Sequence, residues 1–396
     1  MRTRLMLASK FLFAVGLVFG LIVTSSLPAF SQAFSVYHSF AGSDGAYPLN
    51  GLLGSGKILY GTTSSGGASY NGTAFKISAT GVETVLHSFA GGTDGAMPQG
   101  MLIRDKAGNL YGTTTAGGAA GWGTVFKILG KKETVLYSFA GGQDGATPQA
   151  GLAPDAAGNL YGTTVAGGTH GNGTVFRLAP PAIQGGSWTE TVLYSFGASP
   201  DGAAPVAGVT VDTAGNLYGT TSANGAYGYG TVFQLTPGTG WTETTLHSFK
   251  NGSDGSVPYA GLISDKSGNL YGAATQGGTA GGGTIFELSS LNGAWTFNVI
   301  YSVPGSGISG SFRDLMIDAS GVIYGTTHCD GNHSAGTVYK LTPSNGAWTY
   351  QLLYTFTGGA DGLYSFSNLV LVQGNLYGTT ANGDAHSLGG VFRITP

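Results

Sequence analysis

Short apolar segments separated by turn-forming residues recur along the chain from residue 34 onwards. One unit contains four of them, at residues 151–155, 159–164, 173–176 and 192–196. Each is rich in β-branched and aromatic residues and is bounded by Gly, Asn or Asp, a pattern typical of strands joined by hairpin turns. No segment keeps a helical period for long. The unit is therefore predicted to be a four-stranded antiparallel meander, with strands A, B, C and D in chain order.

The tetrad Tyr-Gly-Thr-Thr in strand B shows how often the unit repeats. It begins at Tyr60, Tyr111, Tyr161, Tyr218, Tyr324 and Tyr377, and a Tyr-Gly-Ala-Ala variant begins at Tyr271. Its intervals of 50 to 57 residues are typical of propellers and solenoids. A four-stranded unit cannot bury both of its faces alone, so the units must stack. The prediction is an all-β, seven-bladed β-propeller over residues 34–396. The alternative, a β-solenoid, fits less well because hairpin-linked strands do not form rungs of parallel strands.

The two ends of the repeat region are complementary. The last unit stops after strand C, at residues 391–395, and an additional strand D at residues 35–40 precedes the first strand A. If this amino-terminal strand joins the last blade, that blade gains its fourth strand and the ring closes without an open edge. We therefore expect the ring to be closed by the amino-terminal strand.

The first 33 residues have the pattern of a signal peptide. Arg2, Arg4 and Lys10 flank an apolar run at residues 11–23, and small residues follow up to Ala33. The run is shorter than the ~20 residues of a membrane span. Residues 1–33 are therefore predicted to be a signal peptide cleaved near Ala33. The expected location of the mature chain is secreted, periplasmic or otherwise extracytoplasmic, without membrane insertion.

Composition narrows the classes of partner. Gly accounts for 72 of 396 residues, aromatic residues for 11%, and charged residues for only 9%, with a net charge of −3. Because the net charge is slightly negative and the Lys and Arg residues are scattered along the chain, no basic stripe is predicted. Neither nucleic acid nor an anionic membrane is therefore an expected partner. Cys329 is the only cysteine, so no disulfide can form within the chain and its stability must come from packing. We also expect the protein to be a monomer.

The segments 159–164 (Asn-Leu-Tyr-Gly-Thr-Thr), 171–176 (Gly-Asn-Gly-Thr-Val-Phe) and 192–196 (Val-Leu-Tyr-Ser-Phe) resemble the GloVer tandem repeats of exported bacterial proteins. The resemblance covers nearly all of residues 34–396. Members of this family are surface or secreted proteins that have interchangeable carboxy-terminal anchors and no assigned activity. The resemblance therefore implies a surface or secreted protein. Because the sequence ends within the repeats at Pro396, release rather than attachment is expected. Strands A and B also resemble the NHL type of propeller, as an analogy of fold.

Most polar residues follow the repeat and have structural interpretations. An Asp-Gly pair lies between strand D and the next strand A at Asp44, Asp94, Asp144, Asp201, Asp254 and Asp361. These aspartates are interpreted as Asx turns or, alternatively, as a carboxylate ring for a cation such as calcium, although one Asp per loop falls short of about six oxygen ligands. Strand D opens with Glu83, Glu133, Glu190 or Glu243, and these glutamates are expected opposite Lys76, Lys127, Arg177 and Gln234 of strand C.

The polar and aromatic residues that break the repeat are the candidate ligand-binding residues. They are expected on the face formed by the D–A and B–C loops, and they are Tyr70, Trp122, His170, Tyr227, Tyr229, Asp314, His328, Asp330, His333, Asp384 and His386. The acids and three of the histidines belong to units six and seven. They are interpreted either as loop variation without function or as a ligand or weak metal site. No catalytic motif, metal-binding motif or cofactor fingerprint occurs, so no catalytic residue, metal or cofactor is assigned.

Three functions remain open. The first is an exported, non-enzymatic binding propeller for an extracellular glycan, peptide or protein, because exposed aromatic residues on a rigid frame suit such ligands. The second is a hydrolase or lyase acting on extracellular polysaccharide. The third is a structural protein of the cell surface or matrix.

Overall fold

The structure, a computed structural model, describes residues 32–183, 185–304 and 315–395. The chain divides into two units, Met1–Ser31 and Gln32–Pro396. The predicted signal peptide falls almost entirely on residues 1–31, which lie outside the described residues. Asp314, one of the candidate ligand-binding residues, also lies outside them. Among the described residues no helix is long and apolar enough to cross a membrane.

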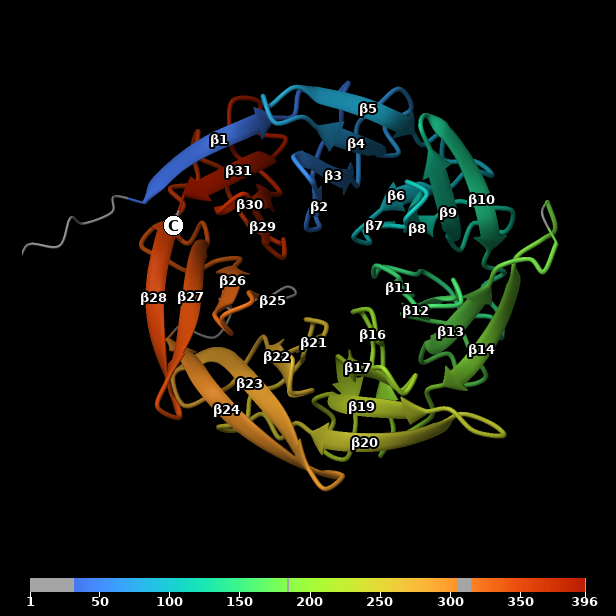
Figure 1. Cartoon of the computed structure of the whole chain (residues 1–396), viewed down its shortest axis with the longest axis vertical. Coiled ribbons are helices and arrows are strands. Elements are labelled where there is room, and N and C mark those ends of the chain that lie inside the picture. Colours follow the sequence, from blue (N-terminus) through green and yellow to red (C-terminus); the bar gives the residue numbers. More distant parts are fainter. Residues whose placement is uncertain (1–31, 184, 305–314, 396) are drawn as a thin grey trace, which may run out of the picture. The chain divides into compact units, whose positions relative to one another are not determined.

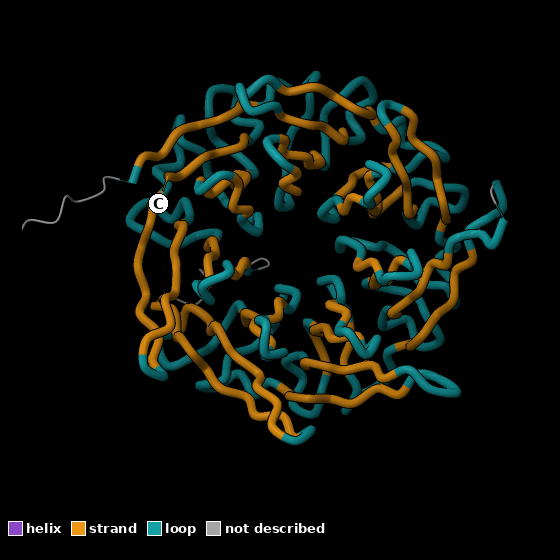
Figure 2. The backbone as a smooth tube through the Cα atoms, viewed as in Figure 1, coloured by secondary structure: helices purple, strands orange, loops and turns teal. Residues whose placement is uncertain are grey.

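The second unit is a ring of seven four-stranded antiparallel sheets, as Figure 1 shows. The predicted all-β, seven-bladed propeller is therefore confirmed. Strand A lies nearest the centre and strand D on the outside, and Figure 2 shows that the outer strands are the longer ones.

The blades repeat the same four strands. Strand A is β2 (Leu53–Ser55), β7 (Ile103–Arg104), β11 (Ala153–Pro154), β16 (Thr210–Val211), β21 (Ile263–Ser264), β25 (Met316–Ile317) or β29 (Val370–Val372). Strand B is β3 (Ile58–Thr63), β8 (Leu110–Ala116), β12 (Leu160–Thr164), β17 (Leu217–Thr221), β22 (Leu270–Ala274), β26 (Ile323–Thr327) or β30 (Asn375–Thr380). Strand C is β4 (Thr73–Ile77), β9 (Thr124–Leu129), β13 (Thr174–Ala179), β19 (Thr231–Thr236), β23 (Gly281–Leu291), β27 (Thr337–Ser344) or β31 (Gly390–Thr395). Strand D is β5 (Glu83–Ser88), β10 (Lys132–Ser138), β14 (Thr189–Ser195), β20 (Thr242–Ser248), β24 (Ala294–Pro304), β28 (Ala347–Thr355) or, for blade 7, β1 (Ala33–Ser39).

Three short strands belong to the loops rather than to this meander. β6 (Ala96–Pro98) pairs with β8, and β15 (Gly202–Ala203) pairs with β18 (Ala223–Asn224). Both pairings join a D–A loop to the end of strand B in the same blade. They extend the sheets into the loops that carry most of the candidate ligand-binding residues.

The amino-terminal strand closes the ring as expected. β1 pairs with β31, with Ala33 opposite Thr395 and Phe34 opposite Ile394. The Phe34 ring also stacks on Tyr354 of blade 6, with 4.0 Å between ring centroids. The first described strand and the last therefore complete one sheet (Figure 1).

The Tyr-Gly-Thr-Thr tetrad has a separate structural role for each residue, as blade 2 shows. Tyr111 donates its hydroxyl to Asp105 of the A–B turn at 3.0 Å. A Cβ on Gly112 would lie 2.6 Å from the Phe126 ring, so the strand C phenylalanine can cover this point only if the residue is glycine. Thr113 donates across the blade boundary to the Ala150 carbonyl at 2.8 Å. Thr114 shares a 2.9 Å hydrogen bond with the hydroxyl of Thr124 in strand C.

The hydrophobic core lies between blades. The strand D phenylalanine of one blade meets the strand C phenylalanine of the next edge-on, as Phe139 meets Phe176 at a centroid distance of 5.2 Å. Both rings are fully buried. Tryptophans of the C–D turns make a second contact, because Trp188 of blade 3 packs against Tyr111 of blade 2. Each blade thus buries its apolar faces only against its neighbours.

The expected pairing of strand D glutamates with strand C cations is wrong. Glu83 lies opposite Ile77, while Lys76 lies opposite Thr84. Adjacent residues of a strand point to opposite faces of the sheet, so this one-residue difference separates the two side chains. The same register holds for Glu133, Glu190 and Glu243.

The glutamates instead face the preceding blade. Glu190 lies near Asp144, which accepts the hydroxyl of Tyr137 at 3.0 Å. Burial, followed by the Asp144 charge, raises the pKa of Glu190 to about 7. Blades 5 to 7 have an aromatic residue at this position, and it stacks on the preceding blade: Phe297 on His247, Tyr350 on Tyr301 and Phe34 on Tyr354. Four blade boundaries therefore carry an acid where the other three carry stacked rings.

Deleting residues 34–40 should destabilise the whole ring, because blade 7 loses its outer strand and blade 6 loses the Phe34 contact. We expect a melting temperature more than ten degrees lower, on the order of the loss of several buried side chains, together with association through the open edge of β31. Calorimetry and size-exclusion chromatography measure both effects. An unchanged melting temperature and elution volume would show that β1 does not close the ring.

Replacing Glu190 with Gln should stabilise the protein at about pH 8 and have little effect at about pH 5. The folded protein keeps a proton on Glu190 that the unfolded chain, with its ordinary pKa of 4.5, releases. The free energy of unfolding contributed by this group therefore falls as pH rises from 4.5 to about 7. Gln imitates the protonated acid at every pH. The melting temperatures of the wild type and the Glu190→Gln variant at both pH values test this. If the variant differs from the wild type by the same amount at both pH values, the prediction is wrong.

Candidate functional site

The D–A loops and B–C loops lie together on one side of the ring, which we call the loop face. The Gly118 amide in the blade 2 B–C loop donates to the Gly92 carbonyl in the preceding D–A loop at 2.9 Å. Gly168 repeats this bond to Gly142 in blade 3. The A–B and C–D turns form the opposite side, the turn face, where Trp188 of a C–D turn packs against Tyr111 beside an A–B turn.

One residue in each of six D–A loops ties neighbouring blades together. Thr147 donates its amide to the Trp122 carbonyl of blade 2 at 2.9 Å and accepts the Val165 amide of its own blade at 3.3 Å. Its φ of 58° is unusual for a β-branched residue. Val257, at φ 55°, makes the equivalent bond to Tyr229. Hydrogen bonds on both sides hold each of these residues in its strained backbone conformation. The loop face is therefore rigid and preorganised.

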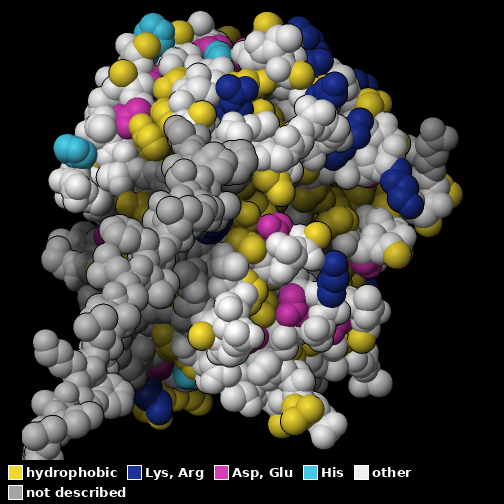
Figure 3. Space-filling model, turned by 60° about the vertical axis from the view of Figure 1, so that its left-hand side comes forward, with side chains coloured by type: hydrophobic (Ala, Val, Ile, Leu, Met, Phe, Trp, Pro, Cys, Tyr) yellow, Lys and Arg dark blue, Asp and Glu magenta, His cyan; other side chains and the backbone are white. Residues whose placement is uncertain are grey.

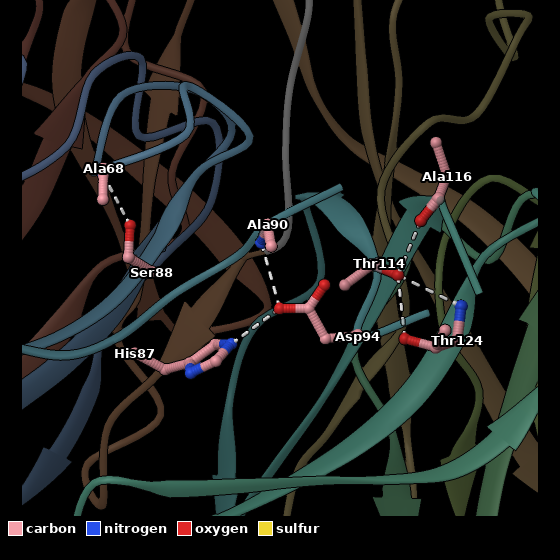
Figure 4. A network of polar contacts seen from close by, with 8 residues as sticks. All are labelled: Ala68, His87, Ser88, Ala90, Asp94, Thr114, Ala116 and Thr124. Carbon is pink, nitrogen blue, oxygen red and sulfur yellow. Dashed lines mark hydrogen bonds and ion pairs between the residues drawn. The ribbon is translucent and has the colours of Figure 1, made fainter. Parts of the chain in front are cut away.

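The Asp-Gly aspartates are bound by groups of the preceding strand D and of their own loop, as Figure 4 shows for the D–A loop that joins blade 1 to blade 2. Asp94 accepts the Ala90 amide at 3.0 Å and lies 3.2 Å from the Nε2 atom of His87. Tyr137 and Asp144 repeat the arrangement with a tyrosine hydroxyl as donor. The aspartates thus cap the loop and hold the strand D tyrosine or histidine. Across the described ranges no three His, Cys, Asp or Glu side chains gather closely enough to hold a metal ion.

The four candidate aromatic residues are exposed on the loop face. Tyr70 is 80% exposed and Tyr227 is 54% exposed. Trp122 lies over Gly141, where a Cβ would meet the indole ring. Tyr227 is covered in part by Lys250, whose ammonium lies 5.2 Å from the ring centroid. These rings are held above loops whose backbones are hydrogen-bonded to neighbouring blades.

Tyr70 occupies a strained position. Its φ is 61°, and the equivalent residues of blades 2 to 5 are Gly121, Gly171, Gly228 and Gly281. A non-glycine residue in this conformation costs about 1 kcal/mol. No buried packing offsets that cost, because the side chain is almost fully exposed. Ser334 and Ser387 hold this position in blades 6 and 7, at φ 52° and 57°, but Tyr70 alone combines the strain with an exposed aromatic ring among the described residues at this position.

Three of the candidate histidines occupy the same place in different blades. His170, His333 and His386 each lie three residues before the glycine that opens strand C, and Tyr227 holds this place in blade 4. All four side chains are exposed. The fold therefore places them around the rim of the loop face as a periodic set, a relation hidden by the different lengths of the repeats.

The remaining candidates in blade 6 face different neighbours. The His328 ring lies 3.9 Å from Phe366 and 4.3 Å from Tyr364, both in the following D–A loop. Asp330 lies near strand D of blade 5, where burial and then the Asp330 charge raise the pKa of Tyr301. The same two causes raise the pKa of the Cys329 thiol.

Asp384 of blade 7 is the candidate acid with the most altered ionisation. Burial raises its pKa to about 6, although the amide of His386 donates to it at 3.2 Å. The side chain is half-buried, between strand D of its own blade and the loop rim. Among the described candidates it is the carboxyl group best suited to donating a proton near neutral pH.

The repeat of the Gloeobacter/Verrucomicrobia family matches residues 14–223 and residues 207–396. The chain belongs to the Gloeobacter/Verrucomicrobia repeat family. This confirms the family resemblance drawn from the strand B, C and D motifs. No protein of curated function matches the sequence.

Three solved structures align over most of this family member. The extracellular domain of a one-component system from B. thetaiotaomicron aligns over 92% of this chain and 40% of its own length, with a TM-score of 0.59 and 10% identity. A candidate 6-phosphogluconolactonase from Bacteroides fragilis aligns over 86% and 93%, with a TM-score of 0.51 and 18% identity. A puromycin-hydrolyzing peptidase from Mycobacterium tuberculosis aligns over 91% and 54%, with a TM-score of 0.52 and 12% identity. At these identities the likeness shows the fold alone.

The axis of this Gloeobacter/Verrucomicrobia repeat protein carries residues that sequence reasoning missed. Asn50, Gln149, Tyr259 and Phe366, at or just before the start of strand A, line a cavity of about 30 Å³. That volume holds one or two water molecules and is too small for a sugar ring. A ligand of ordinary size would lie over this opening rather than enter it. In the sequence, the only sign that these residues are exceptional is that their positions vary between otherwise similar repeats.

Replacing Tyr70 with Gly should leave the free energy of unfolding unchanged or raise it by up to about 1 kcal/mol. Relief of backbone strain, about 1–2 kcal/mol, exceeds the entropy that glycine adds to the unfolded chain, about 0.4–1 kcal/mol. The reverse change, Gly121→Tyr, should cost about 1 kcal/mol, since a Cβ there meets open space. Chemical denaturation measures both. A clear loss of stability in Tyr70→Gly would show that the ring serves folding.

Proposed function

We propose that this protein is an exported, non-enzymatic binding propeller whose loop face takes a glycan chain. The observation that carries the proposal is Tyr70, an exposed ring kept at a strained backbone position without a packing role. Trp122, Tyr227 and Tyr229 extend the same exposed aromatic character to blades 2 and 4. The proposed location outside the cytoplasm rests on the signal-peptide pattern of residues 1–33.

The chemistry of the loop face favours a neutral glycan over a peptide. Sugar rings pack against flat aromatic faces, and hydroxyl groups exchange hydrogen bonds with amides and hydroxyls rather than with charges. The B–C loops consist mainly of Gly, Ala, Ser, Thr and Asn beside these rings. The exposed apolar side chains proposed for ligand contact are aromatic rather than aliphatic. A peptide ligand would depend more on aliphatic pockets or charge pairs.

The rigidity of the loops supports a binding role. Hydrogen bonds fix the Trp122 and Tyr229 carbonyls to Thr147 and Val257 of the following D–A loops. A ligand that contacts such loops loses little affinity to loop ordering. His170, His333 and His386 on the rim, together with His328, Asp330, Asp384 and Asp314, complete the proposed set of ligand-binding residues.

One observation favours the second candidate function, an enzyme acting on polysaccharide. The half-buried carboxyl of Asp384 has a pKa of about 6, which is the ionisation expected of a general acid. A glycosidase also needs a second carboxylate on the other side of the scissile bond. Asp384→Asn would then abolish product formation.

A binding assay on neutral polysaccharides tests the proposed function. A double variant, Tyr70→Ala with Trp122→Ala, should bind its best glycan more weakly by about five-fold or more, since each lost ring contact contributes about 0.5–1.5 kcal/mol. Leu291→Ala with Lys266→Ala, on the turn face, should bind as the wild type does. Equal affinity of the two double variants would refute the proposal, and glycan cleavage by the wild type would favour the enzyme.

A further inference from the structure

Exposed cations are concentrated on one sector of the turn face. Five of the seven exposed Lys and Arg side chains in the described residues belong to A–B and C–D turns or strand ends of blades 1 and 2. They are Lys57, Arg104, Lys106, Lys131 and Lys132. The other two are Lys250 on the loop face and Lys266 on blade 5. In Figure 3 most of the Lys and Arg side chains in view lie toward the upper right of the molecule.

These five cations have no carboxylate partner among the described residues, where the ion pairs are His–Asp pairs such as His87 with Asp94. Asp105, beside Lys106, turns inward and accepts the Asn109 amide at 2.8 Å and the Tyr111 hydroxyl at 3.0 Å. Arg104 donates only to the Ser55 hydroxyl, at 3.3 Å. None of the five exposed cations is therefore held in an ion pair by a described residue.

Exposed aliphatic side chains project from the same sector. Val82, Leu129 and Ile183 lie on the C–D turns of blades 1, 2 and 3 and are 63%, 56% and 76% exposed. Isolated exposed apolar residues are ordinary, but these three occupy consecutive turns next to the cations. They are aliphatic, whereas the exposed candidates of the loop face are aromatic. The two faces therefore offer different chemistry.

A recess lies within this sector, between the A–B turns of blades 2 and 3. It has a volume of about 570 Å³ and combines the apolar side chains of Ile103, Pro154 and Leu160 with Arg104 and Lys106. Asp105 and Asp155 also line it. Both carboxylates accept a tyrosine hydroxyl and the amide groups of an Asn in their own turn. These two carboxylates offset the charges of Arg104 and Lys106 within the recess, so the net positive charge of the sector comes from Lys57, Lys131 and Lys132.

We propose that the turn face of blades 1 to 3 docks onto a membrane surface rich in anionic lipid. Cations near such a surface are attracted to the lipid phosphates, and short aliphatic side chains can enter the headgroup region. An acidic polysaccharide would share the charge attraction but gains little from aliphatic tips. The low net charge did not reveal this surface, because a single sum averages over both faces. The proposal does not depend on the glycan role of the loop face.

Co-sedimentation with vesicles tests the proposal. The protein should bind phosphatidylcholine vesicles that contain about a third phosphatidylglycerol and should not bind phosphatidylcholine alone, and about 0.5 M salt should release it. Each basic residue near an anionic surface contributes roughly five-fold to binding. Lys131→Glu with Lys132→Glu should therefore lower vesicle binding by more than ten-fold. Lys266→Glu, a cation of the same face on blade 5, should bind as the wild type does.

The aliphatic side chains separate a lipid surface from other polyanions. Leu129→Ser with Ile183→Ser should weaken vesicle binding several-fold, whereas Leu291→Ser, an equally exposed C–D turn residue on blade 5, should not. Alginate, a soluble polyuronate, serves as the competing polyanion. Binding to alginate without binding to vesicles would overturn the proposal, as would binding that the Lys131 and Lys132 reversals leave unchanged. Because all these side chains are exposed, matched melting temperatures confirm that the variants fold.

Discussion

The hydrogen bond from the first threonine of the tetrad to the next blade, made in blades 2, 3, 4, 6 and 7, is the contact on which the ring depends. Thr113 reaches the Ala150 carbonyl and Thr163 reaches the Ala207 carbonyl, both in buried surroundings. A buried hydrogen bond of this kind contributes about 1 kcal/mol, and an orphaned carbonyl costs more. It also fixes the start of strand A relative to the previous blade in blades 1, 3, 4, 5 and 7. The D–A loops, the axial cavity and the loop face take their positions from that spacing.

Strand D of each blade packs against the preceding blade in one of two ways. Blades 1 to 4 place a glutamate near the Asp-Gly aspartate of the preceding blade, while blades 5 to 7 place a stacked ring there. The cationic sector of the turn face lies on blades 1 and 2, within the acidic half of these boundaries. The ring is therefore chemically asymmetric although its backbone is nearly repetitive.

The periodic features could be read from the sequence and the exceptional ones could not. The tetrad, the seven units and the closing strand follow from short-range patterns, and the structure confirms them. The partner of Glu83 was mistaken because strand register depends on the turn, and a shift of one residue moves a side chain to the other face. The equivalence of His170 and His386 and the cavity around Asn50 needed the fold, since they depend on residues far apart in the chain. The structure leaves the ligand-binding role of the loop residues as a proposal.

The central claim is that the loop face is a rigid platform held by bonds between blades. Native-state hydrogen exchange of the free protein tests it most directly. The Gly118 and Thr147 amides, which donate to the Gly92 and Trp122 carbonyls of neighbouring loops, should exchange nearly as slowly as those of β8. Exchange of these two amides at the rate of an unprotected loop would show that the B–C loops open independently of the blades, and the claim would be wrong.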